Sequence, residues 1–170
     1  MGIRCLIALF MSSFLLQPLH AQSFQDYTGD FPESVKSYYH IPVDMRDGVA
    51  LATDVYLPDE EGTFPTLLVR DMYTNGSADV RQRYAKFATA NGYAFVFQSV
   101  RGRYDSEGRW YPYFQEINDG DDTLTWIAEQ SWSDGQVGMF GSSYLASVQW
   151  LAALNKNPAL VAIVPAVSPG

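Results

Sequence analysis

Two adjacent serines lie between two apolar segments in the stretch MFGSSYLASVQW, residues 139–150. Gly141 stands two positions before Ser143, and a segment that suits a helix follows at once. A tight turn between a strand and a helix lifts one side chain above the sheet, which is the geometry of a nucleophile elbow. The spacing makes Ser143 the candidate nucleophile and Ser142 its small neighbour. A serine that merely caps the helix would give a similar pattern, so both interpretations stay open here.

A serine hydroxyl attacks a carbonyl only when a base takes its proton and donors stabilise the developing oxyanion. The backbone N–H of Tyr144 lies at the expected helix start and is one such donor. One departure from the standard elbow is visible. The second glycine normally comes two residues after the serine, where this chain has Leu145, and the small residue Ala146 comes one later.

The strands that must hold this turn follow from the apolar pattern. Residues 38–57 alternate between apolar and polar on either side of Asp47-Gly48, which predicts an antiparallel hairpin. Pro42 lacks a backbone donor and places the first strand at a sheet edge. Uninterrupted apolar runs predict strands covered on both faces, the last of them inside the sheet: FPTLLVR, GYAFVFQ, QVGMFG and LVAIVPAV.

Helical patterns lie between these runs. One face of the first helix is expected to consist of Val80, Tyr84, Phe87 and Ala88. Gly92 ends that helix, and Asn118 or Asp119 is expected to cap the second. The third, from about residue 144 to 154, is apolar on nearly every side and is expected to be buried. Helices alternating with strands after a hairpin predict an α/β fold with a mixed, mainly parallel sheet.

A long loop between residues 98 and 118 is rich in glycine, arginine and aromatic side chains. Loops of this length are more often functional than idle. Its aromatic residues could stack on a sugar, line an acyl pocket or seal the core against a lid, and the sequence does not separate these roles: Trp110, Tyr111, Tyr113 and Phe114.

The stretch WSDGQVGMFGSSYLASVQW, with LLVRDMYTN and SVRGRYDSEG before it, closely resembles the cocaine esterase-like hydrolases. That group includes X-Pro dipeptidyl-peptidases of the S15 type, α-amino acid ester hydrolases and glutaryl-cephalosporin acylases. The resemblance runs from about residue 39 to 169 and implies the N-terminal portion of an α/β-hydrolase fold, incomplete at its C-terminus. It implies that Ser143 is the nucleophile and that the Tyr144 backbone N–H and the Tyr73 phenol are the oxyanion donors. Without the resemblance, Tyr73 would be read as an aromatic residue packing at the end of a strand.

In this family the triad aspartate and histidine both follow the elbow. The two histidines of this chain, His20 and His40, both precede Ser143. His40 is expected on the surface or an edge strand, with no acidic residue at a spacing that suggests a partner. We therefore expect the chain to carry the nucleophile and oxyanion hole but not the triad Asp and His, and to be inactive by itself.

The composition narrows the possible partners. A net charge of −8 argues against nucleic acid, which needs clustered cations to neutralise phosphate. Cys5 is the only cysteine and lies in the signal peptide predicted below, so no thiol chemistry is expected after this segment is removed. Asp119, Asp121 and Asp122 complement the dipole of a helix N-terminus without any metal. We expect no metal or organic cofactor, and a small-molecule ester, amide or short peptide as substrate.

The first residues have the features of a secretory signal peptide: Arg4, an apolar run over residues 5–16, and the small Ala21. The run is shorter than the roughly 20 residues of a membrane-spanning helix, so stable membrane insertion is not expected. We predict a secreted or periplasmic protein, cleaved near Ala21. The predicted organisation is a signal peptide over 1–21, a lead-in segment over 22–37 and the N-terminal part of a catalytic domain over 38–170.

The sequence thus predicts a serine hydrolase that cleaves ester or amide bonds, acyl or dipeptidyl, through an acyl-enzyme. Two alternatives remain open at this point. The chain could be a hydrolase-like binding module that keeps the elbow as architecture, or an inactive truncated product. The choice between ester and peptide substrates and the oligomeric state are not determined by the sequence.

Overall fold

The computed structural model describes residues 34–73 and 78–168. The predicted signal peptide and most of the predicted lead-in segment lie outside the described residues. The elements in chain order are β1 (Lys36–Asp44), β2 (Ala50–Leu57), β3 (Phe64–Asp71), α1 (Ala78–Ala90), β4 (Ala94–Ser99), α2 (Glu116–Ala128), β5 (Ser133–Ser142), α3 (Tyr144–Ala153) and β6 (Leu160–Ala166). In these ranges no helix combines the length and apolar character that crossing a membrane requires.

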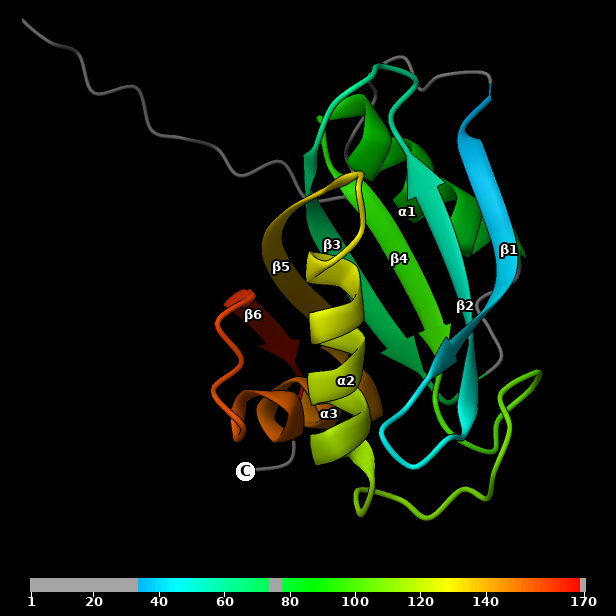
Figure 1. Cartoon of the computed structure of the whole chain (residues 1–170), viewed down its shortest axis with the longest axis vertical. Coiled ribbons are helices and arrows are strands. Elements are labelled where there is room, and N and C mark those ends of the chain that lie inside the picture. Colours follow the sequence, from blue (N-terminus) through cyan, green and yellow to red (C-terminus); the bar gives the residue numbers. More distant parts are fainter. Residues whose placement is uncertain (1–33, 74–77, 169–170) are drawn as a thin grey trace, which may run out of the picture.

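The strands form one sheet in the order β1-β2-β4-β3-β5-β6 (Figure 1). β1 and β2 form the predicted antiparallel hairpin, and β2 also pairs antiparallel with β4. From β4 onward the pairings β4-β3, β3-β5 and β5-β6 are parallel. The predicted mixed, mainly parallel α/β sheet is confirmed, and so is the edge position of the first strand.

The two faces of the sheet carry separate apolar clusters, as the two-residue period of a strand requires. Val55, Leu68 and Val96 point toward the cluster shared with α2 and α3. Their chain neighbours Tyr56, Val69 and Phe95 point to the other face. There they pack with the small α1 residues Ala85 and Ala88. The sheet is therefore covered by α2 and α3 on one side and by α1 on the other (Figure 1).

Burial differs from the sequence expectation along two strands. β2 is buried over nearly its whole length instead of alternating, because it lies between β1 and β4 with side chains packed on both faces. The run LVAIVPAV predicts a strand covered on both faces. In the described part of the chain β6 instead lies at the sheet edge, and Val161 and Val164 are exposed.

The buried faces of α1 and α3 differ from those that the sequence predicts. α1 ends at Ala90, as predicted from Gly92, but it buries Ala85, Ala88 and Thr89 while Val80 is exposed. Small side chains let this helix approach the aromatic cluster closely, which decides the buried face. α3 begins at the predicted position, yet Trp150 on it is exposed.

The predicted cap of α2 is wrong. The helix begins at Glu116, and its N-cap residue Gln115 makes no side-chain capping bond. Asp119 is buried in the first turn, where it accepts hydrogen bonds from Arg101. Arg70 likewise binds Glu116. Because these arginines draw both acidic residues into the protein, the helical turn starts before the residues that could have capped it.

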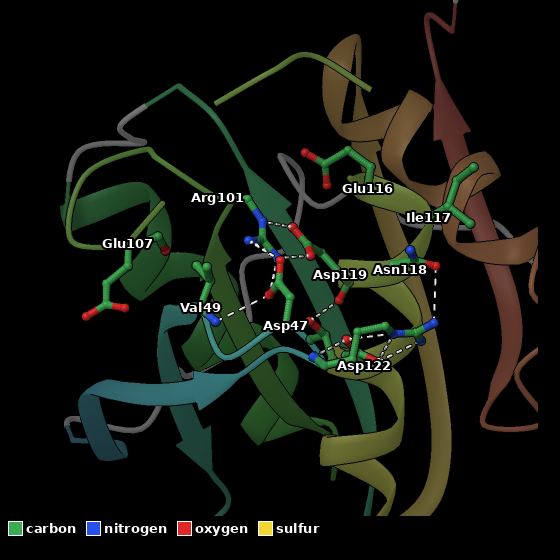
Figure 2. Close-up of polar contacts among 12 residues, drawn as sticks. Asp47, Val49, Arg101, Glu107, Glu116, Ile117, Asn118, Asp119 and Asp122 are labelled. Atoms are coloured by element: carbon green, nitrogen blue, oxygen red, sulfur yellow. Dashed lines mark hydrogen bonds and ion pairs between the residues drawn. The ribbon is translucent and has the colours of Figure 1, made fainter. Parts of the chain in front are cut away.

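Two arginines connect the β1-β2 hairpin to α2, and Figure 2 shows one of them, Arg101, between Asp47 and Asp119. Arg101 bridges Asp47 in the hairpin turn at 2.8 Å and Asp119 in α2 at 2.7 Å. Its hydrogen bond lowers the pKa of Asp47 below the ordinary value. Arg46 contacts Asp121 and Asp122 on the next turn of α2, at 2.6 and 2.7 Å. The bond between Arg101 and Asp119 joins the start of the 100–115 loop to the helix that follows this loop, and the loop contributes to the site described next.

Candidate active site

The chain turns sharply between β5 and α3 at a single residue, Ser143. Its φ of 59° and ψ of −121° lie outside the regions that residues with a Cβ prefer, at a cost of roughly 1–3 kcal/mol. Gly141 has a φ of 141°, and a Cβ there would lie 2.6 Å from the Cβ of Leu145. The turn therefore requires glycine at 141 and holds strain at 143. Such strain is concentrated at functional sites in proteins.

Ser143 occupies the N-cap position of α3, but its hydroxyl makes no capping hydrogen bond. Its Oγ lies 3.0 Å from the Oη of Tyr73, a hydrogen bond in which either hydroxyl can donate. Backbone bonds supply the first contacts of the helix, since Ala146 N–H and Ser147 N–H donate to the Ser143 carbonyl. The exposed hydroxyl of Ser143 is thus directed to the site and not to the helix, which disfavours the capping interpretation.

A buried glutamine braces the turn from below. The Gln149 side-chain amide donates to the carbonyls of Gly141 and Leu145, at 3.3 and 2.8 Å. Its Oε1 accepts the N–H of Val164 in β6 at 2.9 Å. Ser143 N–H also donates to the Ala166 carbonyl at 3.0 Å. Sequence reasoning did not identify Gln149, whose only signal is a polar residue within an apolar helix.

Tyr73 comes two residues after the end of β3, and Ser143 follows the end of β5. Because β3 and β5 are parallel neighbours, their carboxyl ends meet at one edge of the sheet, where α/β proteins place their ligands. The Tyr144 backbone N–H donates to Tyr73 Oη at a long 3.4 Å. The structure therefore brings together the three predicted site residues, with the Ser143 hydroxyl and both predicted donors around one point.

The side chain of Tyr144 is held in the interior. Its hydroxyl donates to Glu116 at 2.9 Å and accepts the N–H of Tyr113 at 3.2 Å. Its ring stacks on that of Tyr113, with ring centroids 5.0 Å apart. Burial, with the nearby charge of Glu116, raises the pKa of Tyr144 to about 12. The phenol therefore stays protonated and donating through the physiological pH range.

Glu116 is in turn paired with a fully buried arginine. Arg70 Nη1 donates to Glu116 at 2.5 Å, and Arg70 Nε donates to Gln98 at 2.8 Å. Thr123 also donates to Gln98, at 2.8 Å. Sequence reasoning missed this buried network under the site. An arginine inside the apolar run LLVRD was the available signal, because a buried charge needs a partner.

A cavity of about 330 Å³ opens beside Ser143. Its volume is within the usual range of small-molecule sites. It is lined by Met72, Tyr73, Trp110, Pro112, Tyr113, Ser143, Tyr144 and Ser147. Of the four aromatic residues singled out in the loop, Trp110 and Tyr113 line the cavity, whereas Tyr111 and Phe114 do not. A larger apolar hollow, of about 460 Å³, lies between α1 and the β5-β6 edge and contains no nucleophile.

His40 lies on the edge strand β1 with an exposed side chain, as predicted. An acidic partner was not expected, yet His40 Nδ1 lies 3.1 Å from Asp105 Oδ2. The 100–115 loop folds back toward β1 and makes this contact, which sequence spacing could not indicate. β2, β4 and β3 separate β1 from β5, roughly 19 Å at about 4.8 Å per strand. His40 is therefore not placed to take the proton of Ser143.

The predicted aspartates of α2 bind arginines in the structure, as described for Arg46 and Arg101. Among the residues that the structure describes, no group of three His, Cys, Asp or Glu side chains is arranged to hold a metal ion.

The family model of the X-Pro dipeptidyl-peptidases (S15 family) matches residues 47–170, which include the hairpin turn, the loop and the elbow. The chain belongs to this family. This confirms the family expected from the motifs around Tyr73 and Ser143. The protein has the α/β fold of this hydrolase family.

Known relatives agree with this assignment. Cocaine esterase of Rhodococcus sp. (strain MB1 Bresler) is 44% identical over 133 residues, which cover 76% of this chain and 23% of that enzyme. A CocE/NonD family hydrolase from Staphylococcus aureus superposes with a TM-score of 0.69 at 28% identity, over 76% of this chain and 27% of its own. An α-amino acid ester hydrolase gives 0.64 at 27% identity, over 91% and 29%. The chain thus spans about a quarter of the length of these relatives.

Proposed function

We propose that this S15-family chain supplies the nucleophile and the oxyanion hole of a serine hydrolase. The carrying observation is the convergence of Ser143 Oγ, Tyr73 Oη and the Tyr144 N–H within 3.0–3.4 Å contacts at the mouth of a cavity. The strain at Ser143 and the missing cap bond of its hydroxyl support the same assignment. A helix that only needed an N-cap would use the serine hydroxyl for that bond.

In the proposed reaction Ser143 Oγ forms a bond to the carbonyl carbon of an ester or amide. The carbonyl electron pair moves to oxygen, and this oxyanion accepts hydrogen bonds from the Tyr73 hydroxyl and the Tyr144 N–H. In the resting site these two donors bind each other and Ser143, so an entering carbonyl oxygen replaces contacts that already exist. Collapse expels the alcohol or amine, and water then hydrolyses the acyl-serine.

The proton of Ser143 must pass to a base and then to the leaving group. His40 is too distant by strand order, as shown above. We propose that a histidine oriented by an aspartate serves this role in the full-length protein. The resemblance to the cocaine esterase-like hydrolases, whose triad histidine and aspartate follow the elbow, supports this proposal.

The proposed substrates are small esters, amides or short peptides. A cavity of about 330 Å³ with aromatic walls from Trp110 and Tyr113 accommodates one compact apolar group beside the nucleophile. The names of two relatives, cocaine esterase and α-amino acid ester hydrolase, support an ester among the candidates.

A fluorophosphonate probe on the full-length protein tests this proposal. We expect labelling of Ser143, loss of labelling in Ser143→Ala, and retained labelling in Ser142→Ala. Ser142 is the matched control because it is the adjacent exposed serine at the end of β5. Equal labelling of the Ser143→Ala protein would refute the proposal.

We also propose that the protein is exported, from the Arg4, apolar run and Ala21 pattern. Sequencing of the N-terminus of secreted or periplasmic material should begin at or near Gln22. Recovery of the chain there with Met1 intact would count against this.

A further inference from the structure

The residue that ends β3, Asp71, lies directly before the segment that carries the proposed side-chain donor. Its side chain is buried, with a residue exposure of 5%. Asp71 Oδ1 accepts the backbone N–H of Tyr73 at 2.8 Å. A carboxylate that binds the amide two residues later closes a local turn and so fixes the backbone of that residue. Asp71 thereby restricts where the Tyr73 side chain can start.

The same short segment is held from the 100–115 loop. Val100 N–H donates to the Asp71 carbonyl at 2.9 Å, and Arg103 Nε donates to the Met72 carbonyl at 2.9 Å. The Arg103 guanidinium also lies over the ring of Trp110, 5.2 Å from its centroid. The backbone before Tyr73 is therefore held on both sides, although the Tyr73 side chain is half-exposed.

We propose that Asp71 is a positioning residue that holds the Tyr73 phenol over Ser143, and that it acts as a hydrogen-bond acceptor for the Tyr73 amide. This inference rests on the proposed function of Ser143 and Tyr73. Tyr73 Oη is 3.0 Å from Ser143 Oγ, and a shift of about 1 Å in a donor is enough to impair catalysis strongly.

The role needs an acceptor and not a negative charge. Burial of Asp71 raises the pKa of its carboxyl above the ordinary value, partly offset by its bonds to the backbone amides of Tyr73 and Met72. The cations that face it, Arg81 and Arg103, lower that pKa less than these contacts do. An asparagine Oδ1 can accept the same backbone bond at the same place. The two substitutions Asp71→Asn and Asp71→Ala therefore separate the acceptor from the charge.

The experiment compares kcat and KM of the full-length protein with four variants: Asp71→Asn, Asp71→Ala, Tyr73→Phe and the double variant Asp71→Ala/Tyr73→Phe. We expect kcat of Asp71→Ala to fall by about 10–100-fold, below the roughly 10²–10³-fold loss of a whole oxyanion donor. KM should change little. Asp71→Asn should stay within about threefold of wild type because it keeps the acceptor.

The double variant decides whether Asp71 works through Tyr73. If it does, Asp71→Ala adds no further loss of kcat once the phenolic hydroxyl is gone. Multiplying losses overturn the proposal, because they place the effect of Asp71 elsewhere. Equal losses in Asp71→Asn and Asp71→Ala also overturn it, since they assign the role to the charge.

Failure of this inference is distinguishable from failure of the proposed function. If Ser143 is not the nucleophile, the Ser143→Ala protein keeps its activity, whereas failure of the Asp71 role leaves Ser143→Ala inactive. Should Asp71→Ala not fold, Asp71→Ser replaces it, because a serine hydroxyl closes the same turn more weakly. A kcat of Asp71→Ser between those of wild type and Tyr73→Phe then supports the proposal. A kcat equal to that of wild type overturns it.

Discussion

The two proposed oxyanion donors are held in opposite ways. The Tyr144 donor is a backbone N–H at the start of α3, and the side chain of that residue is buried against Glu116 and Arg70. The Tyr73 donor is a side-chain hydroxyl on a half-exposed residue, held by a turn at the end of β3. In the proposed site, the oxyanion would thus be stabilised by one donor that the backbone fold supplies and by one that a single side chain supplies.

Replacing a side chain therefore has different consequences in the two regions. No substitution at 144 other than proline removes the backbone donor, so changes around Tyr144 should act on stability. A change at Tyr73 removes the donor itself and leaves the buried core untouched. Substitutions in the two regions test this contrast.

Glu116→Ala should destabilise the protein by about 3–5 kcal/mol, because it leaves the buried Arg70 charge without its partner. Tyr144 also loses the acceptor for its hydroxyl. Urea denaturation measures the loss. Glu129→Ala is the matched control, since Glu129 is exposed at the other end of the same helix, where substitutions usually stay within about 0.5 kcal/mol. Equal stability of the two variants would show that the ion pair between Arg70 and Glu116 does not help to hold Tyr144.

Tyr73→Phe should lower kcat of the full-length protein by about 10²–10³-fold, the usual effect of losing one oxyanion donor. Its unfolding midpoint should stay at the wild-type value because the hydroxyl is not part of the core. Steady-state kinetics and denaturation measure the two quantities. Tyr111→Phe is the control, because Tyr111 is as exposed as Tyr73 but does not line the cavity. An unchanged kcat would return Tyr73 to a packing role.

Tyr144→Phe should show the reverse pattern. The free energy of unfolding should fall by about 1–3 kcal/mol, because Glu116 and the Tyr113 amide lose a buried hydrogen-bond partner. The backbone donor remains, so kcat should fall less than tenfold. The same two assays apply. A loss of kcat as large as that of Tyr73→Phe would abolish the contrast between the two regions.

The pH dependence of stability sharpens the comparison further. The pKa of Tyr144 is about 12 in the folded protein, above the ordinary value of about 10, because burial disfavours the phenolate. The contribution of the Tyr144 hydroxyl is therefore fully present below pH 10 and lost as pH rises through about 12. The stability difference between wild type and Tyr144→Phe should be constant from pH 7 to 9 and shrink above 10. A difference that shrinks already at pH 8 would contradict the burial argument.

Much of the fold was predictable because its signals are local. The Asp47-Gly48 turn, the uninterrupted apolar runs and Gly92 each act within a few residues, and the strands and the end of α1 lie where they indicate. The same holds for the elbow, where Gly141 and Ser143 stand at the required spacing. The start of α2 was not predictable, because distant arginines decide it.

The sequence predicted the residues of the candidate site but not the residues that hold them in place. The motif resemblance named Tyr73, Ser143 and Tyr144, and the structure brings these residues together. It did not indicate Glu116, whose partner lies 46 residues away in the chain. Nor did it indicate the contact between His40 and Asp105.

Short-range signals in the sequence set the local geometry of the chain: a hairpin turn, a strand-to-helix turn that only glycine at 141 permits, and the order of strands and helices. The contacts between these elements depend on the folded structure. Parallel pairing of β3 with β5 brings Tyr73 to Ser143, and burial forces Arg70, Glu116 and Tyr144 into one hydrogen-bonded group. The physical reason is that backbone conformation depends on neighbouring residues, whereas burial and charge pairing depend on residues that only the folded chain brings together.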